Sequence, residues 1–418
     1  MDRFIIEGPT RLAGSVQVGG AKNAVLPLMA ASLLADGESV VENVPDLRDV
    51  RFFMHLLENL GARCTLARGV LRIDTRGLTG REAPYDLVRK MRASIYVLGP
   101  LLAAHGEARV SLPGGCAWGP RPVDLHLQGL ASLSAEIELD QGYIQARAPG
   151  GLRGGKFRFE PSSVGASANV LMAAVLAAGV TELANCALEP EVTELARALA
   201  GAGANIEGIG TSRLIVTGVN ALSPLHHKVI ADRIEAGTFM TAAALTGGRV
   251  RLLRCQPEHL QAVSEVLQTM GCSIESKTNE LTVIGPDRLE PVEVVTRCYP
   301  GFPTDMQAQV MAVTTLAAGT SFITETIYSD RFTHVAELRR LGANIRLDGA
   351  TAIIFGVPRL QGAPVMATDL RASAALVLAG VAAAGTTTVN RVYHIDRGYE
   401  GIEAKLAALG ACIRREQG

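Results

Sequence analysis

A chain of 418 residues is too long for one ordinary hydrophobic core and indicates two or three domains. Hydrophobic residues make up 48% and charged residues 19%, as in a folded globular protein, and a formal net charge of −1 provides no field for a nucleic-acid backbone. Seven cysteines without a CxxC or HExxH pattern argue against a disulfide framework and a protein-held metal. We therefore expect no metal, no cofactor and no nucleic-acid partner.

The two ends of the chain give no sign of a membrane or an export signal. The N-terminus, MDRFIIEGPT, has an apolar stretch of only three residues, 4–6, which is too short for a signal peptide. The most apolar later run, 372–385, is short for a membrane span and indicates a buried core helix. We expect a cytoplasmic protein with no membrane partner, in which segment 1–21 supplies a strand to the C-terminal half.

One phrase, a helix end followed by a turn and a strand, recurs six times: LENLGARCTL, LASLSAEIEL, LAGAGANIEG, LQTMGCSIES, LRRLGANIRL and LAALGACIRR. The turn position recurs every 68 to 73 residues, at Gly61, Ser134, Gly203, Gly271, Gly342 and Gly410. Glycine there takes the left-handed conformation that ends a helix. A second glycine and an alternating strand precede each phrase, so each unit is expected to hold two helices and several strands.

Such a unit is too small to bury its own apolar faces, so three units must pack together. We therefore predict an α/β protein of two similar domains, 22–229 and 1–21 plus 230–418, with a ligand cleft between them. Ser134 is the exception among the turns. A non-glycine residue at positive φ costs roughly 1–2 kcal/mol, so the second turn is either strained or built differently.

Several cationic residues lie at corresponding edges of the repeated units, and most of them begin or border a predicted helix, where free backbone N–H groups also favour anions. The cations are Lys22, Arg92, Arg331, Arg371 and Arg397. Singly, each fits a solvated or ion-paired side chain. Together they indicate a site for a substrate rich in phosphate and carboxylate. Asp305 and Asp369 begin the fifth and sixth units, where helix capping and general-base catalysis are both open interpretations.

The segment LPGGCAWGPRPVDLH (112–126) is rich in glycine and proline and indicates a surface loop. Its Cys116 is the candidate reactive thiol, because a loop is a poor place to hide a cysteine, and Arg121 nearby would favour thiolate. Cys64, Cys272 and Cys412 follow the repeat turns and are expected to fill the core.

These motifs together resemble the enolpyruvyl transferase family, and within it the members that use UDP-N-acetylglucosamine. The resemblance spans the chain, from GGAKNAVLPLMAASLLADG through PGGC, RPVDLH, SVGAS, FPTDMQAQ, TETIYSDRF, ATDLRASA and YHIDRGYE to LGAC. It implies a two-domain inside-out α/β barrel with three units per domain. It also implies transfer of the enolpyruvyl group of phosphoenolpyruvate to the 3′-hydroxyl of UDP-N-acetylglucosamine, with release of phosphate, in peptidoglycan precursor synthesis.

The resemblance also implies residue roles. Cys116 matches the proton donor to phosphoenolpyruvate, which can form an adduct with it, and Asp305 matches the proposed base for the sugar hydroxyl. The residues that match cations holding phosphate or carboxylate are Lys22, Arg121, Arg331, Arg371 and Arg397; those implied at the sugar-nucleotide site are Asn23, Arg92, Arg121, Pro122, Val123, Asp124, Leu125, Ser163, Val164, Gly165, Asp305 and Ile327. Asp369, beside Arg371, completes the candidate substrate-binding set.

Two alternatives remain open. A shikimate-pathway enolpyruvyl transferase shares the fold and the donor but lacks the PGGC loop and takes no sugar nucleotide. A catalytically inactive relative would bind a UDP-sugar only, and the intact Cys116, Asp305 and Lys22 argue against it. Trp118, Pro120 and Pro161 depart from the usual pattern of the family, and none of these departures removes a catalytic residue.

Overall fold

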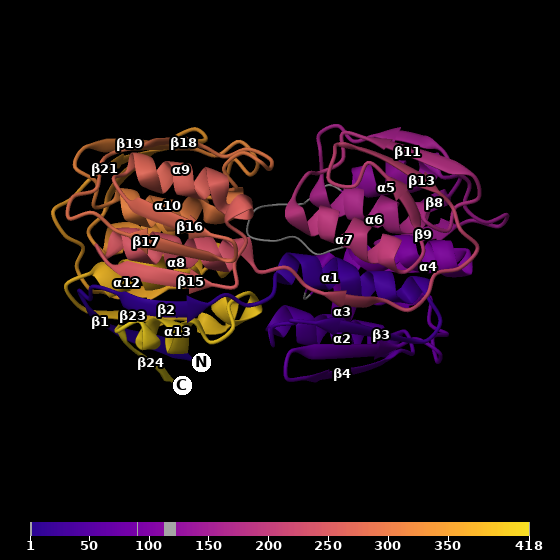
Figure 1. Cartoon of the computed structure of the whole chain (residues 1–418), viewed down its shortest axis with the longest axis horizontal. Helices are drawn as coiled ribbons and strands as arrows, with labels where there is room; N and C mark the ends of the chain where they lie inside the picture. The colour runs from indigo at the N-terminus through magenta and orange to yellow at the C-terminus, as the bar shows by residue number, and fades with distance from the viewer. Residues whose placement is uncertain (1, 90, 113–122, 418) are drawn as a thin grey trace. The chain divides into compact units, whose positions relative to one another are not determined.

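The computed structural model describes residues 2–89, 91–112 and 123–417. By its internal contacts the chain divides into two compact units. The first unit is Gly20–Ile230, and the second is discontinuous, Met1–Gly19 with Ala231–Gly418. Both combine helices with strands (Figure 1). The N-terminal segment thus belongs to the same compact unit as the C-terminal half of the chain.

The strands of the described residues form six open sheets of four strands, three in each unit, all on one plan. In five of the sheets one strand pairs antiparallel with the second strand of a hairpin and parallel with another strand. Strand β3 (Glu38–Glu42), for example, pairs antiparallel with β5 (Val70–Asp74) and parallel with β14 (His226–Lys228). In the sixth sheet the two strands in the place of the hairpin come from opposite ends of the chain. The six sheets correspond to the six repeats of the sequence, and the mixed α/β fold is confirmed.

In the first unit the sheet orders are β14-β3-β5-β4, β6-β7-β9-β8 and β10-β11-β13-β12. Its strands are β3 (Glu38–Glu42), β4 (Arg63–Ala67), β5 (Val70–Asp74), β6 (Glu82–Ala83), β7 (Glu107–Ser111), β8 (Glu136–Asp140), β9 (Tyr143–Arg147), β10 (Lys156–Arg158), β11 (Val180–Ala184), β12 (Asn205–Glu207), β13 (Arg213–Thr217) and β14 (His226–Lys228). Its helices are α1 (Lys22–Ala31), η1 (Ser32–Leu34), α2 (Arg48–Asn59), α3 (Tyr85–Val88), η2 (Arg92–Val97), α4 (Leu98–His105), α5 (Asp124–Ser132), α6 (Val164–Ala174) and α7 (Pro190–Gly201).

In the second unit the sheet orders are β22-β23-β1-β24, β16-β17-β15-β2 and β18-β19-β21-β20. Its strands are β1 (Arg3–Gly8), β2 (Ala13–Gln17), β15 (Arg249–Leu253), β16 (Ser273–Lys277), β17 (Glu280–Ile284), β18 (Glu293–Val295), β19 (Thr320–Thr324), β20 (Asn344–Asp348), β21 (Thr351–Phe355), β22 (Pro364–Met366), β23 (Gly385–Asn390) and β24 (Cys412–Glu416). Its helices are α8 (Arg233–Leu245), η3 (Pro257–Leu260), α9 (Gln261–Thr269), η4 (Thr304–Met306), α10 (Gln307–Thr314), α11 (His334–Arg340), α12 (Leu370–Ala382), η5 (Val392–Arg397) and α13 (Ile402–Ala408).

The N-terminal segment supplies two strands to the second unit. Strand β1 lies between β23 and β24 and is antiparallel to both. Strand β2 pairs in parallel with β15. The side chains of Phe4 and Ile6 on β1 are fully buried, which explains the short apolar stretch at the start of the chain. This segment is therefore part of the core and not an appendage.

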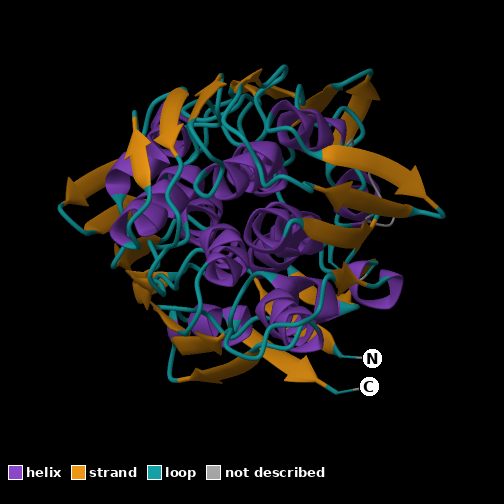
Figure 2. Ribbon diagram, turned by 90° about the vertical axis from the view of Figure 1, so that its right-hand side faces the viewer, coloured by secondary structure: helices purple, strands orange, loops and turns teal. Residues whose placement is uncertain are grey.

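One helix of each repeat is buried on nearly all sides. In α12 every residue from Arg371 to Val381 is buried, and α8 and α10 are similar. A helix that is apolar all round belongs in a core. In Figure 2 the helices gather in the middle of the view and the strands lie around them. The apolar run 372–385, expected to form a buried core helix, is largely α12, and that prediction is confirmed.

All six repeat turns share one hydrogen-bond pattern. The residue after each turn position donates its N–H to the carbonyl five residues earlier, as in Ala204 to Leu199 at 3.0 Å and Ala135 to Leu130 at 3.3 Å. This is the bond that closes a helix through a left-handed residue. Ser134 keeps this geometry with φ of 68°, so the second turn is built like the others despite the lack of glycine.

The cysteines after the turns differ from one another. Cys272 is buried and Cys64 is half-buried, but Cys412 is exposed, so the expectation that it fills the core is wrong. Cys272 directly follows its turn glycine, whereas Cys412 stands one residue further along, at the start of β24. Since side chains alternate between the faces of a strand, that one-residue difference turns Cys412 outward.

Candidate active site

The predicted site residues fall into two groups, one in each unit. The described part of the first unit holds Lys22, Asn23, Arg92, Val123, Asp124, Leu125, Ser163, Val164 and Gly165. The second unit holds Asp305, Ile327, Arg331, Asp369, Arg371 and Arg397. The loop positions Cys116, Arg121 and Pro122, with Trp118 and Pro120, lie outside the described residues.

Asp305 lies between two arginines in the second unit. It is the middle residue of η4, which leads into α10. Its Oδ2 accepts hydrogen bonds from Nε and Nη2 of Arg371 at 3.1 and 2.9 Å, and its Oδ1 lies 2.9 Å from Nη1 of Arg331. The arginine side chains are only 4% and 9% exposed, whereas that of Asp305 is 28% exposed. The carboxylate therefore holds two buried cations at a surface that water reaches.

The two arginines set the charge of Asp305. Burial raises the pKa of its carboxyl, but the charges and hydrogen bonds of Arg371 and Arg331 outweigh burial and hold that pKa well below its usual value. Burial lowers the pKa of Arg371, and the charge of Asp305 more than reverses this, so that pKa is raised. While both arginines are paired with it, Asp305 is an ionised carboxylate and a weak base.

Arg371 is positioned by the start of α12. Oδ1 of Asp369 caps this helix by accepting hydrogen bonds from the backbone N–H groups of Arg371 and Ala372 at 2.9 and 3.1 Å. The guanidinium carbon of Arg371 lies 5.5 Å from the ring centre of Tyr399. Of the two acidic residues for which helix capping was an open interpretation, Asp369 is a cap and Asp305 instead pairs with arginines.

Arg331 is held from a second side. Its Nη1 donates to Oγ1 of Thr304 at 2.9 Å, and Thr304 donates its own hydroxyl proton to Oε2 of Glu325 at 2.8 Å. Oε1 of Glu325 accepts from the backbone N–H of Ile327 at 2.9 Å. Thr304 and Glu325 were missed by the sequence analysis. The available signal for Glu325 was an acidic residue directly after a half-buried alternating strand, in TETIYSDRF.

Arg397 is the last residue of η5 and is half-buried. The neighbouring Asp396 is fixed by Arg415 of β24, whose Nη1 donates to Oδ2 of Asp396 at 3.1 Å. Arg415 also donates from Nε to Glu403 at 2.8 Å. The C-terminal strand therefore stabilises the short helix that carries Arg397.

Lys22 and Arg92 begin helices of the first unit. Lys22 and Asn23 are the first two residues of α1, and Nζ of Lys22 lies 3.2 Å from Oδ2 of Asp49. The side chain of Asp49 is 3% exposed and that of Lys22 is 12% exposed, so this ion pair is largely shielded from water. Arg92 begins η2, which packs against α1. The two cations thus come from helices in contact.

The other predicted residues of the first unit lie at the starts of α5 and α6, two helices packed against each other. Val123 precedes α5, and Asp124 and Leu125 are its first two residues. Ser163 caps α6, since its Oγ accepts from the backbone N–H of Ala166 at 3.3 Å. Two helix starts carrying N–H donors are suited to an anionic or polar ligand. Val164 and Gly165 follow the cap as the first two residues of α6.

His126 fixes the contact between these two helix starts. Asn169 donates from Nδ2 to Nδ1 of His126 at 3.0 Å, so the ring proton lies on Nε2. Burial, only partly opposed by Asp124, lowers the pKa of His126 to about 4, and the ring is neutral at pH 7. A Cβ at Gly165 would lie 3.1 Å from Nε2. Glycine at 165 therefore lets the start of α6 approach the imidazole.

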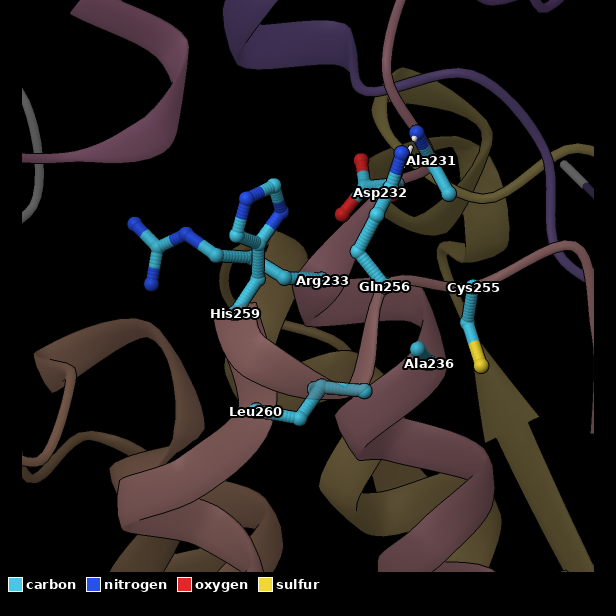
Figure 3. A pocket seen from close by; sticks show the side chains of 8 residues that line it. All are labelled: Ala231, Asp232, Arg233, Ala236, Cys255, Gln256, His259 and Leu260. Carbon is cyan, nitrogen blue, oxygen red and sulfur yellow. Dashed lines mark hydrogen bonds between the residues drawn. The ribbon is translucent and has the colours of Figure 1, made fainter. Parts of the chain in front are cut away.

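A shallow hollow at the start of α8 has none of the predicted site residues in its lining (Figure 3). The polar side chains that line it accept hydrogen bonds from backbone N–H groups. Oδ1 of Asp232 accepts from the N–H of Ile234 at 2.8 Å, and Oε1 of Gln256 accepts from that of Ala231 at 3.2 Å. Burial raises the pKa of the Cys255 thiol to about 11, which makes it a poor nucleophile. These side chains therefore stabilise the backbone where α8 begins, and this structural role explains the polar residues of the hollow.

Over the described ranges, no cluster of His, Cys, Asp and Glu side chains has the makings of a metal site. Over the same ranges, no helix combines the length and the apolar character needed to cross a bilayer. The candidate residues instead form pairs of carboxylates and cations.

Comparison with known proteins gives the same family along the whole chain. The family model of EPSP synthase (3-phosphoshikimate 1-carboxyvinyltransferase) matches residues 6–406. A relative from Anaeromyxobacter sp. (strain Fw109-5), named UDP-N-acetylglucosamine 1-carboxyvinyltransferase, is 55% identical, with 100% of both chains covered. A relative of the same name from Myxococcus xanthus (strain DK1622) is 53% identical, again with 100% of both chains covered.

Solved structures agree with this assignment. The enolpyruvyl transferase NikO from Streptomyces tendae has a TM-score of 0.90 at 26% identity, covering 100% of this chain and 99% of its own. EPSP synthase from Acinetobacter baumannii has a TM-score of 0.75 at 18% identity over 100% of both chains, which shows the shared fold. The fold, the family match and the full-length relatives together establish that this chain belongs to the EPSP synthase family of enolpyruvyl transferases.

Proposed function

We propose that this protein transfers the enolpyruvyl group of phosphoenolpyruvate to the 3′-hydroxyl of UDP-N-acetylglucosamine and releases phosphate. The observation that carries the proposal is the set of full-length relatives at 52–56% identity named UDP-N-acetylglucosamine 1-carboxyvinyltransferase. The residues fit this chemistry, because both substrates are anionic and the candidate site is built around cations. In the cell the reaction would be the first committed step of peptidoglycan precursor synthesis, in the cytoplasm, and would serve cell-wall biogenesis, cell shape and division.

The reaction is an addition followed by an elimination. The sugar oxygen attacks C2 of phosphoenolpyruvate and gives its proton to Asp305, while C3 receives a proton from Cys116. The resulting tetrahedral ketal then loses a proton from C3 and expels phosphate, which restores the double bond. In this scheme Cys116 is also the residue that forms a covalent adduct with phosphoenolpyruvate. Lys22, Arg121 and Arg397 would contact phosphate, which stabilises the charge that develops in the transition state.

The pairing of Asp305 with two arginines gives substrate binding a role in its basicity. The carboxylate and phosphate of phosphoenolpyruvate would compete with Asp305 for Arg331 and Arg371, which lie 2.9 to 3.1 Å from its carboxylate oxygens. When these cations turn to the substrate, the force that keeps the pKa of Asp305 low is weakened, and its carboxylate becomes a stronger base. Asp305 would then be a competent base mainly when phosphoenolpyruvate is bound.

The sugar-nucleotide site would be formed by Asn23, Arg92, Arg121 to Leu125, Ser163 to Gly165, Asp305 and Ile327, with Asp369 beside the phosphoenolpyruvate end. The described helix starts at Asp124 and Val164 present backbone N–H groups, which supports binding of a polar or anionic group there. The partners of the protein would be these two small-molecule substrates, with no nucleic acid and no membrane.

A test of this function measures phosphate release from phosphoenolpyruvate with two acceptors, UDP-N-acetylglucosamine and shikimate 3-phosphate. We expect release with the sugar nucleotide only. Release with shikimate 3-phosphate alone would assign the shikimate-pathway reaction, which the matching family model also describes. Binding of the sugar nucleotide without release of phosphate would indicate a catalytically inactive relative.

The role of Cys116 has its own test. Mild alkylation with an epoxide or iodoacetamide should abolish turnover in step with labelling at Cys116. Cys298 and Cys412 are exposed and will also react, so peptide mapping must separate the three sites. Loss of activity while Cys116 stays unlabelled would refute its catalytic role.

A further inference from the structure

Glu325 is a buried carboxylate directly after β19, the strand labelled at the top of the second unit in Figure 1. Glu325 as a whole is only 1% exposed. Among the described residues, four groups donate to it: the hydroxyls of Thr296 and Thr304 at 2.7 and 2.8 Å, and the backbone N–H groups of Ile327 and Tyr328 at 2.9 and 3.0 Å. A buried carboxylate is costly unless it is hydrogen-bonded in this way.

The first consequence concerns Arg331. A threonine hydroxyl has one proton to donate, and Thr304 gives it to Oε2 of Glu325. The Thr304 oxygen can then only accept, and it accepts from Nη1 of Arg331 at 2.9 Å. The same Nη1 lies 2.9 Å from Oδ1 of Asp305. Glu325 therefore sets the polarity of a chain of contacts that ends on a candidate arginine and the candidate base.

The second consequence concerns the loop after β19. Oε1 of Glu325 accepts from the N–H groups of Ile327 and Tyr328, which closes the turn. It also accepts from Thr296, whose hydroxyl oxygen accepts from the N–H of Thr326 at 2.9 Å. One side chain thus joins the segment after β18, the helix start that carries Asp305 and the loop that carries Ile327.

We propose that Glu325 is a positioning residue for enolpyruvyl transfer, which orients Arg331 through Thr304 and fixes the loop of Ile327. The inference rests on the proposed function, because it assigns meaning to the orientation of Arg331 and Asp305. Glu325 acts through these residues and is not placed in contact with substrate.

Replacement of Glu325 by glutamine is the sharpest perturbation. The volume stays the same, but one acceptor oxygen becomes an NH₂ donor. If NH₂ takes the Oε2 position it meets the Thr304 hydroxyl, which must then turn its proton elsewhere and lose its fixed polarity toward Arg331. If NH₂ takes the Oε1 position it meets the N–H groups of Ile327 and Tyr328. Either orientation sets a donor against donors.

The test compares Glu325→Gln with a matched control, Glu194→Gln. Glu194 is a similarly buried glutamate, 4% exposed, on α7 of the first unit, where it lies 2.9 Å from Nε2 of His227. With UDP-N-acetylglucosamine as acceptor, we expect kcat to fall by ~10²-fold in Glu325→Gln, the scale of a small misplacement of catalytic groups. Glu194→Gln should keep kcat within about threefold at a comparable melting midpoint.

Three readouts separate positioning from a merely structural role. Thr304→Val should lower kcat, and the double variant Glu325→Gln/Thr304→Val should be no slower than Glu325→Gln, because both act through one path. The acidic limb of the kcat/KM profile should also move to higher pH in Glu325→Gln, since a loosened Arg331 holds Asp305 less strongly. Glu325→Asp should recover part of the rate. If Glu325→Gln does not fold, Thr304→Val and Glu325→Asp carry the same comparison.

The proposal is wrong if folded Glu325→Gln has the kcat and pH profile of the unmodified protein, or if the two substitutions lower kcat independently. Failure of the proposed function has a different signature: the unmodified protein would release no phosphate with UDP-N-acetylglucosamine. In that case the role of Glu325 is tested by calorimetry, which measures the binding of phosphoenolpyruvate alone to each variant. Binding about tenfold weaker in Glu325→Gln than in Glu194→Gln would support the positioning of Arg331, and equal binding would overturn it.

Discussion

At the turn that ends one helix of each repeat, the six copies share a single backbone geometry, with φ between 68° and 106°. At the start of the buried helix, by contrast, the copies carry different side chains: Lys22 begins α1, Ser163 caps α6, and Asp369 caps α12, whose second residue is Arg371. The turn is constrained because the fold depends on it, whereas the helix start is free to vary. The repeats therefore share their architecture at one end and differ in chemistry at the other.

The helices α8 and α12 of the second unit make this difference concrete. Both have 13 residues and an aspartate cap, Asp232 and Asp369, that accepts from two backbone N–H groups. Behind its cap, α12 carries Arg371, which is bonded to Asp305. Behind its own cap, α8 carries Arg233, whose guanidinium carbon lies 5.6 Å from the ring centre of Tyr299. Capping belongs to the fold, and we expect only the arginine of α12 to serve the reaction.

A large loss of activity is expected for only one of these two arginines. Arg371→Ala should lower kcat/KM by ~10²–10³-fold, the range for loss of one preorganised donor to a developing charge. Arg233→Ala should leave kcat/KM within about twofold, as expected for a substitution away from such a site. Steady-state phosphate release measures both. Equal losses in the two variants would break the distinction between α8 and α12.

Asp305→Asn tests the carboxylate that α12 holds. Turnover should fall by ~10²–10⁴-fold if Asp305 is the general base, because an amide does not accept the sugar proton. Binding of UDP-N-acetylglucosamine should stay within about tenfold, as measured by calorimetry. Normal turnover in Asp305→Asn would leave only a structural, arginine-pairing role for this residue.

The same variant has a signature in stability. The folded pKa of Asp305 is lowered, so its contribution to the free energy of unfolding is complete above the unfolded value of about 3.9. That contribution is lost as the pH falls through the folded pKa. The stability gap between the unmodified protein and Asp305→Asn should therefore be constant near neutral pH and shrink below about pH 4. Denaturant titrations of both proteins across that pH range would measure the gap. A gap that stays the same below about pH 4 would contradict this prediction.

The repeats could be predicted from the sequence because a left-handed turn favours glycine, and glycine recurs at this position at a regular interval. The sequence analysis located Asp305 and Arg371 separately but not their ion pair, because the two residues are 66 positions apart and no periodic pattern links them. Glu325 escaped for a related reason: its four donors come from three segments that only the fold brings together. Cys412 was misplaced because one residue of offset reverses the face of a strand.

A smaller effect is expected at the caps themselves. Asp232→Ala and Asp369→Ala should each cost about 1 kcal/mol of stability, since each removes the acceptor for two N–H groups at a helix start. Asp369→Asn keeps a capping oxygen and removes only the charge. If Asp369 also serves the substrate, this variant should lose turnover at nearly unchanged stability. Unchanged turnover would leave Asp369 as a cap alone, like Asp232.

The smallest effect is expected at the turn that all six repeats share, where Ser134 has a φ of 68° although it is not glycine. Ser134→Gly should raise the free energy of unfolding by roughly 1 kcal/mol, because glycine occupies that region without the steric cost that a Cβ brings.

The matched control is the reverse change in the next repeat, Gly203→Ser. An added Cβ at Gly203 would meet nothing within 4 Å, so any loss of stability there is conformational and not a clash. The two substitutions should therefore shift the denaturation midpoint of the first unit in opposite directions by similar amounts, with turnover unchanged in both. A midpoint that Ser134→Gly leaves unmoved, beside a lowered one for Gly203→Ser, would mean that the serine side chain compensates for its own backbone strain.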